Sequence, residues 1–75
     1  MLDLLFRSRY KRECDMDDAL NHIGRHGAAA LTIARDRAGD SRLTKRNRRH
    51  WQRISRLVAR LEREQQEGMA LAQNG

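Results

Sequence analysis

The chain contains no proline, one cysteine and three aromatic residues in 75 positions. The single cysteine, Cys14, excludes an intrachain disulfide, so a reducing cytoplasm is the expected compartment. Val and Ile are few, and no stretch alternates apolar and polar residues over a useful length, which argues against strands. Ala, Leu, Arg and Glu dominate instead. The sequence therefore predicts an all-α protein.

Long hydrophobic runs are also missing. The apolar run at the start of the chain, residues 1–6, has no basic residue before it and is too short for a signal peptide or a membrane span. We therefore expect a cytoplasmic protein. A chain of this length can form one domain at most, residues 1–75, whose core rarely supplies more than about 3–5 kcal/mol. Small proteins often compensate by self-association, so a homo-oligomer is expected.

Residues suited to catalysis or metal binding are scarce. Cys14 stands between two acidic residues, which disfavour the thiolate that a nucleophile requires. His22 and His26 are four residues apart, a spacing that lets two imidazoles meet one metal ion, but no CxxC and no second ligand pair accompany them. No glycine-rich phosphate loop is present. The sequence therefore predicts no enzyme, no metal site and no cofactor.

The first expected helix covers about residues 2–13, with Leu2, Leu5 and Phe6 on one face. A helix of this length is marginal in isolation, so it has to pack on the rest of the chain. A small lid over the core is favoured over an amphipathic membrane anchor, because interfacial helices usually carry a longer apolar face.

Two longer helices are expected to follow, separated by a short break at Gly39. Asp15 is a suitable N-cap for a helix over about residues 16–38. The last helix should cover about residues 42–66, with a frayed tail at 68–75. A break of two or three residues makes neighbouring helices antiparallel. The expected fold is a short N-terminal helix plus a long antiparallel helical hairpin, which two chains would pair into a four-helix bundle.

Acidic residues are nearly absent from residues 41–63, where nine Lys or Arg stand against one Glu. At 100° per residue, most of these basic residues share one flank of the helix, beside its apolar face. Solvated helix faces more commonly alternate the sign of their charge. A one-sided row suits a phosphate backbone, and arginine favours bidentate contacts. The residues predicted to bind nucleic acid or an acidic partner are Arg42, Lys45, Arg46, Arg49, Arg53, Arg56 and Arg60.

Three hypotheses for function follow from this row. The leading one is a non-enzymatic binding protein whose last helix docks on nucleic-acid phosphates without strong sequence specificity, because long arms and a two-residue break do not match a helix-turn-helix. The alternative is a regulator or inhibitor that binds an acidic protein surface, for example a phage-encoded inhibitor of a bacterial nucleoprotein complex. Trp51, His22 and Ile33 would then anchor the partner, although a tryptophan is more commonly a core residue. The third is self-assembly alone. None of them involves a small-molecule substrate or a membrane.

A further pattern extends over residues 19–61. Its members are Ala19, His26, Gly27, Ala30, Gly39, Asp40, Trp51, Ile54, Leu57 and Leu61. The pattern resembles that of a group of short helical alpha-proteobacterial or phage-type proteins of unknown function. The chain differs from that group in its high arginine content and in the segment 42–49. The resemblance implies a helical fold and a bacterial or phage source, and it implies no activity.

Overall fold

The chain is almost entirely helical in the computed structural model, which describes the backbone of residues 2–74 and the side chains of residues 11–68. Helix α1 covers Leu2–His26, a short 3-10 turn η1 covers Gly27–Ala29, α2 covers Ala30–Ala38 and α3 covers Lys45–Asn74. Residues 2–74 contain no strand, so the all-α prediction is confirmed. The apolar face predicted near the N-terminus falls on side chains outside the described part.

The break between the first two helices lies at Gly27, whereas the sequence predicted it near Asp15. Helix α1 continues through Asp15, so this residue is not the predicted N-cap; its carboxylate accepts a hydrogen bond from Arg53 of α3 at 3.1 Å. Gly27 has φ +54°, a left-handed conformation that glycine adopts without the steric cost of a Cβ atom. The prediction of one continuous helix over about residues 16–38 is therefore wrong, since the break at Gly27 leaves α2 with only 9 residues.

His22 stabilises this break from the preceding turn of α1. Its side chain is 6% exposed, and its Nε2 lies 2.8 Å from the carbonyl oxygen of Ala30. A carbonyl oxygen can only accept, so Nε2 carries the proton and donates the hydrogen bond. The bond ties the end of α1 to the start of α2 across the 3-10 turn.

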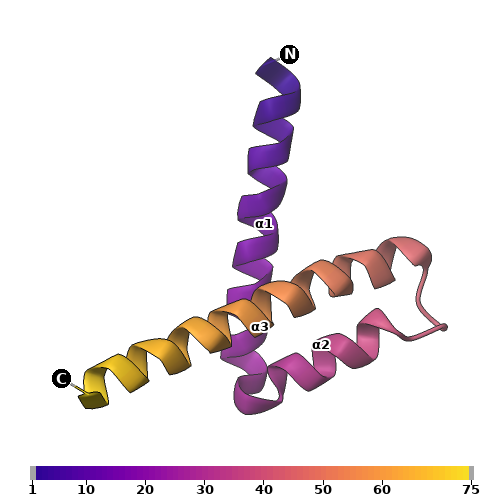
Figure 1. Ribbon diagram of the computed structural model, residues 1–75. Coiled ribbons are helices and arrows are strands. Elements are labelled where there is room, and N and C mark those ends of the chain that lie inside the picture. Colours follow the sequence, from indigo (N-terminus) through magenta and orange to yellow (C-terminus); the bar gives the residue numbers. More distant parts are fainter. Residues whose placement is uncertain (1, 75) are drawn as a thin grey trace.

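The chain reverses direction between α2 and α3, which lie side by side and antiparallel (Figure 1). Gly39 ends α2 with φ −103°, and its backbone N–H donates to the Arg35 carbonyl at 3.2 Å. Thr44 caps α3, because its Oγ1 accepts a hydrogen bond from the Asn47 N–H at 3.1 Å. Helix α3 therefore begins three residues after the predicted start and continues past Gly68, where fraying was expected.

Helix α1 crosses α3, and its N-terminal half extends away from the other two helices (Figure 1). The C-terminal half of α3 likewise extends beyond α2. The extents of the chain are 45 × 36 × 16 Å. The smallest of these corresponds to two layers of helices, because packed helices lie about 8–10 Å apart. Among the described residues, no helix is both long and apolar enough to cross a membrane.

The core lies where the three helices meet. Its fully buried residues are Ala19 of α1, Ala30 and Ala34 of α2, and Ile54 and Val58 of α3. The small alanine side chains allow the backbones of α1 and α2 to approach α3 closely. Ile54 and Val58 are the only large side chains that are completely buried among residues 11–68. Full burial of each stabilises the fold by about 1.5–3 kcal/mol. The core is small, and α3 supplies its largest members.

Candidate functional site

The basic row of α3 lies on the flank that faces α1. Arg53, Arg56 and Arg60 line an open notch of about 380 Å³ between the two helices. Arg12 of α1 lines the same notch, which the sequence did not predict. Arg12 is far from α3 along the chain, and only the crossing of the helices brings it beside the row. We refer to these four arginines and the residues between them as the basic notch.

The floor of the basic notch is apolar, and its charge is strongly unbalanced. Met16 and Leu57 supply the apolar part, and among residues 11–68 Asp15 is the only carboxylate that lines it. The described lining thus holds four arginines and one carboxylate. The excess of positive charge, together with the fixed fork of donors on each arginine, suits an oxyanion such as phosphate or carboxylate.

Two of the four arginines already contact a carboxylate. Arg53 Nε donates to Asp15 Oδ2 at 3.1 Å, in a pair whose side chains are 38% and 13% exposed. Arg60 Nε donates to Glu64 Oε1 at 3.1 Å, but both of these side chains are mostly exposed. Exposed pairs one helical turn apart contribute only about 0.3–0.5 kcal/mol, so an incoming anion can replace Glu64 at little cost. Arg12 and Arg56 have no carboxylate partner among residues 11–68.

Three further predicted residues extend the row toward the start of α3. Lys45, Arg46 and Arg49 are exposed, and none of them forms an ion pair within the part of the chain that the structure describes. They continue the positive surface of the notch along the helix. The predicted row is therefore available to a partner over most of its length, from Lys45 to Arg60.

Arg42 is placed differently, in the loop that connects α2 to α3. Its Nε and Nη2 each donate to the carboxylate of Asp40 at 3.0 Å, and its backbone N–H donates to the same group at 2.9 Å. These hydrogen bonds from Arg42 lower the pKa of Asp40. Arg42 thus closes the loop on itself, but its side chain is 88% exposed, so its predicted contact with a partner stays a prediction.

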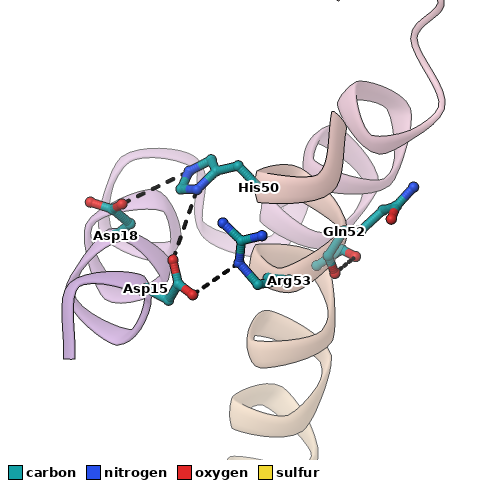
Figure 2. A network of polar contacts seen from close by, with 6 residues as sticks. Asp15, Asp18, His50, Gln52 and Arg53 are labelled. Atoms are coloured by element: carbon teal, nitrogen blue, oxygen red, sulfur yellow. Dashed lines mark hydrogen bonds and ion pairs between the residues drawn. The ribbon is translucent and has the colours of Figure 1, made fainter. Parts of the chain in front are cut away.

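A second polar cluster joins α1 to α3 beside the notch (Figure 2). His50 Nδ1 lies 3.9 Å from Asp15 Oδ1, and His50 Nε2 lies 3.8 Å from Asp18 Oδ2. The three side chains could each offer a ligand atom to a metal ion. However, the two imidazole nitrogens point to different carboxylates, and Arg53 holds the other oxygen of Asp15 (Figure 2). The arrangement fits a network of polar contacts between α1 and α3 better than a metal centre.

The predicted anchoring residues come from all three helices: His22 from α1, Ile33 from α2 and Trp51 from α3. The His22 ring contacts Trp51 edge-on at 5.1 Å between ring centroids, and the Arg37 guanidinium lies 4.5 Å above the Trp51 ring. Burial, followed by the charges of His22, Arg37 and Arg25, lowers the pKa of His26 in the same group. His22 is buried, while Trp51 and Ile33 are half-buried. His22 is thus occupied within the fold and is not available to anchor a partner.

The geometry supports an anion-binding surface formed by α1 and α3 together. The residues of this surface that lie on α3 were predicted from periodicity and charge. The place of Arg12 in it became clear only from the structure, in which α1 crosses α3. Comparison of the chain with protein-family models, with curated proteins and with solved structures finds no match.

Proposed function

We propose that the protein is a non-enzymatic binding protein whose basic notch and adjoining α3 row dock on nucleic-acid phosphates. The observation that carries this proposal is that Arg12, Arg53, Arg56 and Arg60, from two helices, line one notch in whose described lining Asp15 is the single carboxylate. Like charges repel, so an anion that enters the notch would offset the repulsion among these arginines.

Binding of this kind should be dominated by counterion release. Each phosphate that the protein neutralises steepens the dependence of log K on log salt by about 0.9 for duplex DNA and about 0.7 for a single strand. Six basic residues of the surface form no ion pair, or only an exposed one, with residues 11–68: Arg12, Lys45, Arg46, Arg49, Arg56 and Arg60. Four to six phosphate contacts correspond to a duplex slope of about −4 to −5.

Sequence-specific reading is not expected at this surface. Among residues 11–68, the lining of the notch offers four guanidinium groups, one carboxylate and two apolar side chains, with no amide that could pair with adenine. Phosphate contacts fix position and orientation without carrying sequence information. We therefore propose that affinity depends on backbone charge and shape.

Fluorescence anisotropy with labelled duplex and single-stranded oligonucleotides, over a range of salt, tests the proposal. Arg56→Glu should lower the affinity about tenfold or more, because it removes one phosphate contact and adds a repulsive charge to the notch. Arg35→Glu is the matched control, since Arg35 is exposed on α2 away from the notch and the change in net charge is identical. Equal losses in both variants, or an affinity indifferent to salt, would refute the proposal.

An acidic protein surface is the second candidate partner, as a regulator or inhibitor would require. The observation in its favour is the apolar floor of Met16 and Leu57, which could receive an apolar side chain between two carboxylates. An acidic amphipathic peptide should then displace a labelled oligonucleotide from the notch. Displacement by the peptide at lower concentrations than by the unlabelled oligonucleotide would favour the protein partner.

A further inference from the structure

A second hollow of the surface, of about 500 Å³, is lined by residues of α1, α2 and α3. Its lining includes every histidine of the chain and the only tryptophan: His22, His26, His50 and Trp51. Ligand sites in proteins are typically clefts of about 300–1,000 Å³ that combine aromatic surface with a few polar groups. We refer to this hollow, with the side chains that line it, as the histidine cavity.

Two arginines give one side of the histidine cavity an excess of positive charge. Arg25 of α1 and Arg37 of α2 line it, and neither forms an ion pair with residues 11–68. Burial lowers the pKa of His26 in the same lining, followed in effect by the charge of His22. The charges of Arg37 and Arg25 lower this pKa further. An oxyanion on this side would therefore meet two guanidinium groups with free donors.

The rest of the lining offers hydrogen-bonding groups and a flat ring. Asp18 is its only carboxylate among residues 11–68, and Asp18 Oδ2 lies 3.8 Å from His50 Nε2 (Figure 2). Asn21 adds an amide, which can both donate to and accept from the edge of a nucleobase. Trp51 is half-buried and supplies the kind of aromatic surface on which bases stack. This side of the cavity thus suits a nucleobase.

We propose that the histidine cavity binds one nucleotide, with the base beside Trp51 and the phosphate on Arg25 and Arg37. The Arg37 guanidinium lies 4.5 Å above the Trp51 ring. Contact of a cation with a partly exposed ring contributes less than the stacking of a base on it. The base therefore takes the place of Arg37 on the ring, and the released guanidinium turns to the phosphate.

The nucleotide can be free or can belong to a single strand. The cavity adjoins the basic notch, because His50 lines the cavity and its Nδ1 lies 3.9 Å from Oδ1 of Asp15, which lines the notch. A strand whose phosphates lie on the notch could place one unpaired base in the cavity, whereas the bases of a duplex are paired and stacked. A free nucleoside monophosphate carries the same two groups and needs only the cavity. The inference therefore does not rest on the function proposed for the notch.

Titration of the full chain with adenosine monophosphate, followed by tryptophan emission, tests the proposal. Trp51 is the only tryptophan, so its emission reports on this cavity, and a base stacked on it should quench the emission. In competition titrations, adenosine monophosphate should bind at least about tenfold more tightly than ribose phosphate, which lacks the base, and adenosine, which lacks the phosphate. Emission unchanged at millimolar adenosine monophosphate, or equal affinity for it and for ribose phosphate, would overturn the proposal.

Two variants separate binding from folding. Asn21→Ala, at an exposed position of α1, should weaken adenosine monophosphate about fivefold and leave ribose phosphate unchanged. Arg37→Gln should weaken both ligands about tenfold or more, because it removes a charged donor to the phosphate. Arg35→Gln, at an exposed position of α2 outside the lining, is the matched control and should change neither affinity. If Arg37→Gln lowered Tm but left both affinities at the wild-type value, Arg37 would only pack on Trp51 and the phosphate site would be refuted.

Oligonucleotides distinguish the two sources of the nucleotide. Quenching of Trp51 by a single strand, with little quenching by the matched duplex, would show that the cavity takes an unpaired base of a strand. Quenching by adenosine monophosphate alone would identify the free nucleotide as the ligand. If a labelled strand bound in fluorescence anisotropy while neither ligand quenched Trp51, the basic notch would stand and the histidine cavity would be refuted.

Discussion

Replacing Asp15 by asparagine should weaken the fold and strengthen anion binding at the same time. The carboxylate of Asp15 accepts from Arg53 Nε at 3.1 Å and faces His50 Nδ1 at 3.9 Å, so it links α1 to α3. It is also the only negative charge that lines the basic notch in the part of the chain whose side chains are described. The variant Asp15→Asn keeps the size of the side chain and removes this charge.

The two effects can be given magnitudes from the structure. The side chain of Asp15 is 13% exposed and that of Arg53 is 38% exposed, so solvent partly screens this ion pair. Loss of the pair should therefore lower the free energy of unfolding by about 1 kcal/mol. In a domain of this size, that cost lowers Tm by about 4–8 °C. For binding, the released Arg53 adds one phosphate contact, which should steepen the duplex salt slope by about 0.9 and raise the affinity several-fold at low salt.

Thermal denaturation followed by circular dichroism measures the first effect, and fluorescence anisotropy measures the second. Asp36→Asn is the matched control, because Asp36 is exposed on α2 and forms no ion pair among the described residues. It should change the free energy of unfolding by less than about 0.5 kcal/mol. If Asp15→Asn bound nucleic acid no more tightly than Asp36→Asn, Asp15 would not restrain the notch and our reasoning would be refuted.

Three other predictions concern the fold. Gly27→Ala should lower the free energy of unfolding by about 1–2 kcal/mol because residue 27 has φ +54°. Gly68→Ala, at a position with open space around it, should instead increase the helicity of α3. Chemical denaturation measures the first effect and circular dichroism the second, and equal effects of the two variants would contradict the assignment of the break. Ile54→Ala should destabilise the chain by about 2–5 kcal/mol in urea denaturation, and a loss below this range would show that the core lies elsewhere. The contact of Asp40 with Arg42 lowers the pKa of Asp40 in the folded state, so its stabilising effect is present above the unfolded pKa and is lost as the pH falls through the folded value. Asp40→Ala should therefore melt below the wild type at neutral pH and approach it in acid, and a difference that stayed constant with pH would contradict this assignment.

The buried face of α3 could be predicted from the sequence because it depends on helical period alone. Ile54 and Val58 are completely buried, and Trp51, Leu57 and Leu61 pack around them at spacings of three and four. The position of the break in the second predicted helix could not be predicted in this way. Glycine can continue a helix or adopt a left-handed conformation, and no neighbour of Gly27 in the sequence decides between them.

Asp15 and Arg12 show the same limit at the candidate site. An aspartate followed by further acidic residues fits an N-cap, and the competing partner of Asp15, Arg53, is 38 residues away in sequence. Arg12 belongs to the notch only because α1 crosses α3. Local pattern therefore predicted the α3 side of the site, and the contribution of α1 depends on tertiary contacts that the pattern does not encode.

The contribution of Arg12 tests most directly whether two helices form one anion-binding surface. The measurement is the slope of log K against log salt for duplex binding by the wild type and by Arg12→Ala. We predict a wild-type slope of about −4 to −5, and a slope shallower by about 0.9, with weaker binding, for the variant. A wild type that does not bind at low salt, or a slope and affinity that Arg12→Ala leaves unchanged, would contradict the account.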